Sequence, residues 1–484
     1  MGLKDSAIKG VAWTSVGTLS GGFFTVLVNI LMARMLTPAD FGLMEIILVF
    51  SFLSDVIVDS GFSQAIIRDS EVNNNALSSV FFLNITIAFI IYTILFSISP
   101  SIAKYYNSPE LSNLARFTFL SILCNSFLVV PNAYQNRQLN FKPFAIATLF
   151  STLIAGIISC TLAYRGIGIW ALAINFVLTY FLRTLIVFFQ TKWRPKFTFR
   201  FSYIKKYYNF GVKLLLMGLL DKFVTNIESL LIGKYYTKAD LGYFSQGRKI
   251  DSYVIQLFMR IINTVSYPTL SKLKKDNNNL KIGYQTVLKI TICGITPVIA
   301  CLISCSENII ICFLGEKWVP SAIYLRIWTF CGYLVTIYSF FTNTFLVKGK
   351  SGQLLIVSCI RQSARLIAII LLIRISIIAT MYGIVAVTIF SFILYVYFGG
   401  KQINYKITEF LNDIIPFVIS GISVGLMAWL INNSLSVQST FLRLIIQVVI
   451  LFVSYIIILL SLKNKTLKSI IDILKNKHFA HEKN

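Results

Sequence analysis

The residues of this sequence that could do chemistry are the charged side chains that stand inside otherwise apolar segments. Arg361 and Arg365 lie four residues apart in one such segment, so a helix would place both on one face. Arg260 lies in another. A charge at the centre of a bilayer costs about 2.5–3.5 kcal/mol on insertion scales, so it normally faces a partner or a water-filled cavity. These three arginines are therefore the candidates for a cationic, substrate-binding patch.

A second group of charges, of mixed sign, gathers in the segment 210–233. Asp221 and Glu228 are seven residues apart and so share a helix face, and Lys213 and Lys222 are close to them in sequence. The two carboxylates are candidates to bind a coupling H+ or Na+. The alternative is that they neutralise Lys222 and Lys213.

Other charges have a simpler explanation. Arg248 and Asp251 are expected at a helix end among lipid headgroups, and Asp55 and Asp59 close to the membrane interface.

The sequence offers no set of residues for a metal, a cofactor or a catalytic site. The only histidines, His478 and His481, lie in a polar tail, and the eight cysteines, none in a CxxC pair, are expected to be inert apolar packing. No glycine-rich nucleotide-binding loop occurs. We therefore expect no cofactor, no metal and no enzyme activity.

The elements that must position these charges are membrane helices. Charged residues make up 13% of the chain and hydrophobic residues 56%, against about 25% charged in typical soluble domains. Uncharged runs such as 77–99, 144–164 and 444–462 can each cross a hydrocarbon core of about 30 Å as a helix. The net charge of +25 does not indicate nucleic acid, because the lysines lie between the runs.

We predict an all-α polytopic membrane protein with about fourteen transmembrane helices. The segments are 9–33, 41–61, 77–99, 114–133, 144–164, 168–190, 210–233, 249–270, 284–306, 321–347, 353–373, 379–398, 413–432 and 441–462. An even count places both termini on one side. The lysine-rich and arginine-rich connections favour the cytoplasm for that side.

An internal repeat divides the chain. Residues 33–42 read ARMLTPADFG and residues 233–242 read GKYYTKADLG; further matches are LARF with LRIW, around Arg116 and Arg326, and GIWAL with GIVAV. Six helices per repeat predict two lobes, 1–200 and 201–405, related by a pseudo-two-fold axis along the membrane normal. The remaining part, 406–484, would hold two additional helices and a basic cytoplasmic tail. In the repeated turn, Asp40 is expected to cap the following helix.

ARMLTPADFGLMEI, GVAWTSVG, DSGFSQAIIR and LLIGKYYTKADLGYFSQGRKI resemble a known family. They look like the polysaccharide transport branch of the multidrug/oligosaccharidyl-lipid/polysaccharide exporter superfamily, within it the Wzx-type O-unit flippases and the colanic and teichuronic acid exporters. The resemblance runs to about residue 400.

The resemblance implies a flippase that moves an undecaprenyl-diphosphate-linked oligosaccharide from the cytoplasmic to the periplasmic leaflet of a bacterial inner membrane by alternating access. The product would serve surface polysaccharide such as O-antigen, capsule or exopolysaccharide. Arg260, Arg361 and Arg365 would then meet the diphosphate, which the planar fork of arginine suits. Partners would be membrane lipid and polysaccharide polymerase machinery. The alternative is an ion-coupled multidrug exporter of the same superfamily.

Overall fold

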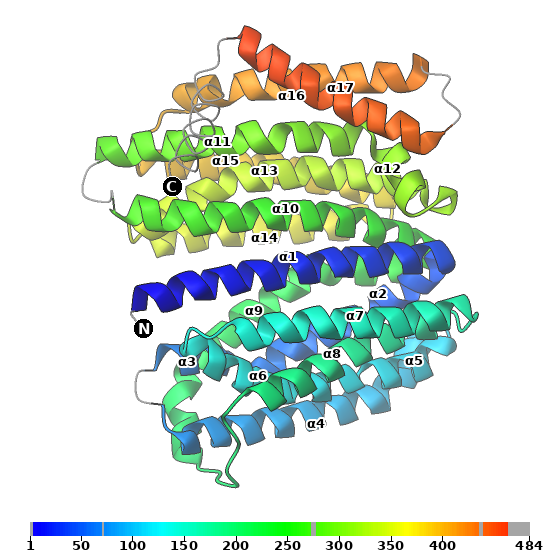
Figure 1. Ribbon diagram of the computed structural model, residues 1–484, viewed down its shortest axis with the longest axis vertical. Helices are drawn as coiled ribbons and strands as arrows, with labels where there is room; N and C mark the ends of the chain where they lie inside the picture. The colour runs from blue at the N-terminus through cyan, green and yellow to red at the C-terminus, as the bar shows by residue number, and fades with distance from the viewer. Residues whose placement is uncertain (1–2, 70–71, 273–276, 435–438, 463–484) are drawn as a thin grey trace, which may run out of the picture. The chain divides into compact units, whose positions relative to one another are not determined.

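The computed structural model of the chain describes residues 3–69, 72–272, 277–434 and 439–462, and all regular structure in these ranges is helical (Figure 1). The helices are α1 (Leu3–Met35), α2 (Pro38–Asp59), α3 (Phe62–Arg68), α4 (Asn74–Tyr105), α5 (Glu110–Thr118), α6 (Leu120–Arg137), α7 (Lys142–Tyr164), α8 (Trp170–Gln190), α9 (Phe201–Tyr235), α10 (Lys238–Lys272), α11 (Asn277–Ser304), α12 (Ser306–Phe313), η1 (Glu316–Trp318), α13 (Ser321–Val347), α14 (Ser351–Leu372), α15 (Ile377–Lys401), α16 (Ile407–Ser434) and α17 (Thr440–Ser461). The predicted all-α class is confirmed.

Eleven helical segments among the described residues are long and apolar enough to cross a membrane. They include α2 with α3 as one 31-residue segment and α5 with α6 as one 28-residue segment. The three other predicted spans coincide with the helices α1, α9 and α10. Within α1, Ser20–Met35 is a shorter apolar helix. The chain is a multi-pass membrane protein, and the count of fourteen stays a prediction.

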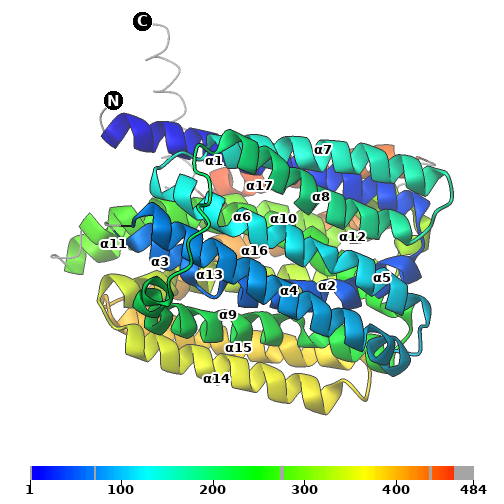
Figure 2. The same cartoon turned by 90° about the horizontal axis from the view of Figure 1, so that it is seen from below.

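Contacts within the chain divide it into two compact units, Met1–Ser245 and Gln246–Asn484. In the first unit α7 packs on α1 and α8, α6 packs on α4 and α8, and α2 packs on α6 and α9; Figure 2 shows α4, α6 and α8 side by side. In the second unit α13 packs on α11 and α15, α14 on α15, and α16 on α11 and α17. We predicted the lobes 1–200 and 201–405 and the region 406–484 from a sequence repeat and its symmetry. The division by contacts does not test that symmetry, so these boundaries stay a prediction.

The repeated turn has the same local structure in both copies. Thr37 Oγ1 accepts from the backbone N–H of Asp40 at 3.3 Å, and Asp40 Oδ2 accepts from the N–H of Thr37 at 2.8 Å. Thr237 and Asp240 repeat this capping box, at 3.1 and 3.2 Å. The N-cap residue is therefore the threonine, and the aspartate three residues later closes the box, which refines the expectation that Asp40 caps α2.

The glycines of the two turns meet each other's backbone. A Cβ atom on Gly42 would lie 1.8 Å from the carbonyl oxygen of Lys238, and one on Gly242 would lie 1.9 Å from that of Pro38. No side chain fits at either position, so the start of α2 and the start of α10 touch through two glycines in a reciprocal contact.

A ladder of charged side chains joins the first halves of α11 and α16. Lys281 Nζ lies 2.5 Å from Glu409 Oε2, and Lys289 Nζ lies 2.7 Å from Asp413 Oδ1. Tyr405 donates to Asp413 Oδ2 at 2.6 Å. Both partners in each ion pair therefore have their charge compensated, as charges in membrane helices require.

Amide side chains hold the other end of α16. Asn308 of α12 donates to Asn432 at 2.8 Å and to the buried Gln447 of α17 at 2.7 Å, and Gln447 donates to the carbonyl of Ala428 at 3.0 Å. The last two helices are thus tied to α11 and α12 by polar contacts at both ends.

Candidate functional site

The two arginines of α14 lie on the more buried side of that helix. Val357, Arg361, Arg365 and Ile369 follow one another at four-residue spacing and so form one row along the helix. Val357 and Ile369 are buried at 4% and 0% exposure, whereas Ile356 and Ile367 on the opposite side are exposed. The row therefore faces the interior of the second unit and carries two positive charges into it.

Aromatic side chains of α13 and α15 surround these arginines. Arg361 Nη1 donates to the hydroxyl of Tyr338 at 3.4 Å. The Tyr338 ring stacks on that of Tyr395, with centroids 4.7 Å apart and planes 6° apart, and the Tyr395 hydroxyl lies 2.9 Å from Ser358 Oγ. Tyr338 and Tyr395 are buried, so this chain of contacts joins α13, α14 and α15 into one rigid wall.

The second arginine meets a tryptophan. The guanidinium carbon of Arg365 lies 5.7 Å from the centre of the Trp328 ring, within the range of a cation–π contact. Arg361 makes one long hydrogen bond, and its Nε has no hydrogen-bond partner among the described atoms. Donors on a rigid wall inside an apolar protein are suited to bind an anion.

The third arginine of the predicted patch cannot be placed beside them. Arg260 belongs to α10, but its side chain lies outside the described part of the chain.

The charges of α9 separate into two environments. Lys213, Asp221 and Lys222 are exposed, whereas Glu228 is completely buried. Ser229, next to Glu228, donates to Oε1 of the buried Glu45 of α2 at 3.4 Å. The predicted pair Asp221 and Glu228 thus shares a helix face, but only Glu228 lies in the packed interior of the first unit.

A polar network that the sequence did not reveal lies between α2, α6 and α8. Asp55 Oδ1 accepts from Asn125 Nδ2 at 2.8 Å, and Asp55 Oδ2 accepts from the Tyr180 hydroxyl at 3.1 Å. The guanidinium of Arg183 lies 5.9 Å from the Tyr180 ring, and Lys222 of α9 interacts electrostatically with Asp55. Asp55 therefore connects three helices, whereas the sequence placed it near the membrane interface, where water would be its partner.

Asp251 also differs from its expected position. The sequence placed it at a helix end among headgroups, but it lies within α10 and is 7% exposed. Its Oδ1 would be 2.9 Å from a Cβ on Gly332 of α13. The expected helix end was wrong because α10 begins at Lys238, well before the predicted start of the span, so Asp251 falls inside the helix. Asn125, Tyr180 and Tyr338 were missed because an uncharged polar residue in an apolar helix gives no signal of its own.

The sequence of the chain matches a known protein family. Residues 31–323, more than half of the chain, match the family described as polysaccharide biosynthesis protein. The chain belongs to this family. The match contains both repeated turns and the Asp55 network, and it ends before Arg361 and Arg365.

Two bacterial proteins are similar to this chain in sequence. The teichuronic acid biosynthesis protein TuaB of Bacillus subtilis (strain 168) is 24% identical over 356 residues, covering 72% of this chain and 73% of the relative. The lipopolysaccharide biosynthesis protein WzxC of Escherichia coli (strain K12) is 24% identical over 328 residues, covering 66% and 65%.

Solved structures show the fold of the family. The lipid II flippase MurJ in an inward closed conformation has a TM-score of 0.75 at 18% identity, covering 93% of this chain and 98% of that one. An inward-facing multidrug resistance MATE family transporter of the MOP superfamily has a TM-score of 0.62 at 12% identity, covering 82% and 98%. The family shares its fold with transporters of this superfamily, as the sequence resemblance implied.

Proposed function

We propose that this protein is a flippase that moves an undecaprenyl-diphosphate-linked oligosaccharide from the cytoplasmic to the periplasmic leaflet for the synthesis of a surface polysaccharide. The observation that carries the proposal is the match over residues 31–323 to a polysaccharide biosynthesis family. Two similar proteins are named for teichuronic acid and lipopolysaccharide biosynthesis, which supports the same class of cargo. The fold shared with a lipid II flippase is consistent with such a cargo. The protein would act as a transporter by alternating access and not as an enzyme.

Arg361 and Arg365 are the residues proposed to meet the diphosphate. They project from one face of α14, where Tyr338 and Trp328 orient them, and a diphosphate offers several oxygens to their planar forks. Arg260 is proposed to join them. The cost of holding two cations among apolar helices is offset when the anion arrives.

Coupling to H+ or Na+ is proposed to involve Glu228. Its side chain is buried in the first unit, and the adjacent Ser229 donates to the buried Glu45 of α2. A carboxyl group buried among apolar helices favours uptake of a proton or a cation. Asp221 is the second candidate, and because it is exposed beside Lys222 it also fits the role of neutralising Lys222 and Lys213.

The proposed setting is the bacterial inner membrane, with both termini in the cytoplasm. The support is the concentration of lysine and arginine in alternate connections of the sequence. Polysaccharide polymerase machinery is the proposed partner on the opposite side, since it would consume the translocated oligosaccharide.

Complementation tests the proposal. The chain is expressed in a bacterium that lacks its own O-unit flippase, and surface polysaccharide and lipid-linked precursor are both measured. Restored polysaccharide with cleared precursor is the expected result. Accumulated precursor together with new resistance to cationic dyes would instead identify an ion-coupled multidrug exporter.

A further inference from the structure

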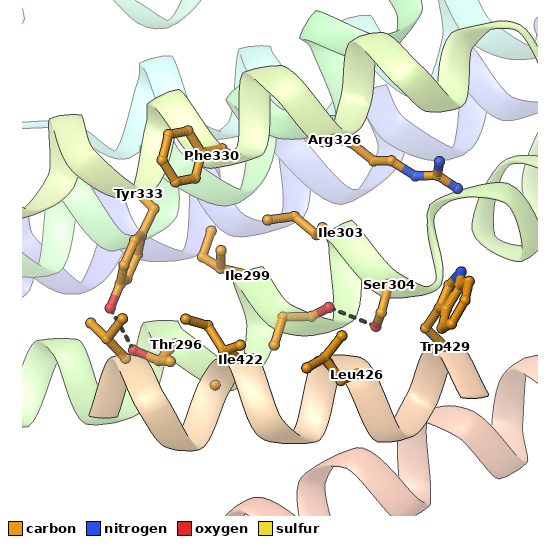
Figure 3. Close-up of a pocket in the computed structure, with 14 residues that line it drawn as sticks. Thr296, Ile299, Ile303, Ser304, Arg326, Phe330, Tyr333, Ile422, Leu426 and Trp429 are labelled. Atoms are coloured by element: carbon orange, nitrogen blue, oxygen red, sulfur yellow. Dashed lines mark hydrogen bonds between the residues drawn. The ribbon is translucent and has the colours of Figure 1, made fainter. Parts of the chain in front are cut away.

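An apolar groove of about 560 Å³ lies in the second unit between α11, α13 and α16 (Figure 3). This volume is in the range of ligand pockets. Its lining is apolar for most of its length, with side chains such as Ile299, Ile303, Phe330, Ile422 and Leu426 pointing into it.

Small residues create the space and leave it open on one side. A Cβ on Gly421 would lie 2.4 Å from Thr296 Cγ2, so α16 touches α11 there. One turn further, a Cβ on Gly425 would have no neighbour nearer than Ala300 Cβ at 3.9 Å. Ile422 and Leu426 on the rim are 58% and 56% exposed. The groove therefore opens to the outside of the unit, where a multi-pass membrane protein meets lipid.

The two ends of the groove differ in chemistry. One end is closed in the middle of the helices, where Thr296 Oγ1 and the Tyr333 hydroxyl lie 2.9 Å apart. At the other end stand Arg326, near the start of α13, and Trp429, near the end of α16 (Figure 3). An arginine and a tryptophan at helix ends are typical of the headgroup level of a membrane.

Arg326 is held in place but retains binding capacity. Its Nε donates to Ser306 Oγ at 2.6 Å and its Nη2 to Glu307 Oε1 at 2.7 Å. Two of five N–H donors are used by these bonds. The Arg326 and Glu307 side chains are 40% and 50% exposed, so a positive and a negative group are presented side by side at the mouth of the groove.

The length of the groove matches one leaflet. Its lining on α16 runs from Val418 to Trp429, eleven steps that span about 16 Å at 1.5 Å per residue. Half of a hydrocarbon core of about 30 Å is about 15 Å. An acyl chain that starts at the headgroup level and ends at the bilayer midplane would therefore fill it, whereas a polyprenyl chain is far longer.

We propose that this groove binds one acyl chain of a phosphatidylethanolamine molecule whose phosphate contacts Arg326 and whose ammonium group contacts Glu307. A zwitterionic headgroup complements the neighbouring charges at the mouth. A second phosphate, as in a lipid diphosphate, would be repelled by the Glu307 carboxylate. The site is separate from the arginines of α14 and does not depend on which cargo is transported.

Native mass spectrometry of the purified, delipidated protein tests the site, with dioleoyl phosphatidylethanolamine and dioleoyl phosphatidylglycerol as probes. The wild type is expected to bind one phosphatidylethanolamine about two- to five-fold more tightly than phosphatidylglycerol, the effect of one half-exposed ion pair. Glu307→Gln should abolish the preference while phosphatidylglycerol still binds.

Two variants test the position of the lipid. Gly425→Leu fills the groove at a point with free space, and Arg326→Gln removes the charge at its mouth; each should lose both lipids. Arg326→Lys keeps the charge, so it should retain phosphatidylethanolamine and show that the position tolerates change. Arg116→Gln, at the repeat counterpart of Arg326, is the matched control and should bind as the wild type does.

Three results would overturn the proposal. They are equal affinity of the wild type for both lipids, phosphatidylethanolamine retained by Gly425→Leu and Arg326→Gln, or a polyprenyl-linked glycan found as the co-purified occupant that Gly425→Leu removes.

Discussion

Replacement of Gly42 by alanine tests the reciprocal contact between the starts of α2 and α10. The added Cβ would lie 1.8 Å from the Lys238 carbonyl oxygen, and ordinary contact begins near 3.4 Å, so the two backbones must separate by about 1.6 Å. Overpacking of this kind costs about 1–3 kcal/mol. The better helix propensity of alanine returns about 0.8–1 kcal/mol. We expect a net loss of up to about 2 kcal/mol of stability, measured as thermal unfolding of the purified protein in detergent.

Gly22→Ala is the matched control, because no atom lies within 4 Å of a Cβ at that position in α1. It should stabilise the protein slightly. Gly242→Ala should behave like Gly42→Ala, and the double variant should cost less than the sum, since a single separation of the two turns relieves both clashes. Equal effects of Gly42→Ala and Gly22→Ala, or full additivity of the two turn variants, would refute the contact.

Three further predictions follow from the side-chain contacts. Replacing Arg361 and Arg365 together by alanine should abolish clearance of lipid-linked precursor without loss of membrane expression. Alanine at the exposed loop residue Arg165 is the control and should leave clearance unchanged. Unchanged clearance in the double variant would remove both arginines from the site. Lys289→Met should cost about 1.5–3 kcal/mol because Asp413 loses its charged partner, and adding Asp413→Asn should recover part of it in a double-mutant cycle of thermal unfolding. Burial and the hydrogen bond to Asp69 raise the pKa of Tyr207 above its usual 10.0, so the folded state keeps this proton longer than the unfolded chain. That stabilisation is complete below about pH 10 and is lost as pH rises through the folded-state pKa. The unfolding temperature of Tyr207→Phe should therefore depend less on pH between 9 and 11.5 than that of the wild type. Identical pH profiles of the two proteins would contradict the reasoning.

The sequence predicts the elements of this fold well, because each one has a local signal. Every predicted span coincides with one helix or with two consecutive helices, since a run of about twenty apolar residues leaves the backbone no other way to satisfy its hydrogen bonds in lipid. The repeated turn is equally local: the spacing of Thr37 and Asp40 is that of a capping box, and the same spacing recurs at Thr237 and Asp240.

The partners of the charged residues could not be predicted, because they depend on how helices rotate against one another. Asp55 meets Asn125 and Tyr180, which lie 70 and 125 residues further along the chain. Arg361 meets Tyr338 from a different helix. Asp251 was placed wrongly because the true start of α10 lies eleven residues before the predicted start of the span. Periodicity within one helix cannot report any of these relations.

The bonds that α16 and α17 make have a consequence for how the chain could be shortened. Lys289 and Asn308, on α11 and α12, find their partners at Asp413, Asn432 and Gln447. A protein ending after α15 would leave a lysine and an amide facing hydrocarbon without partners, at a cost of several kcal/mol. We therefore expect a relative that lacks the last two helices to carry apolar residues at positions 289 and 308. The residue types at these two positions would then indicate whether the final pair of helices is present.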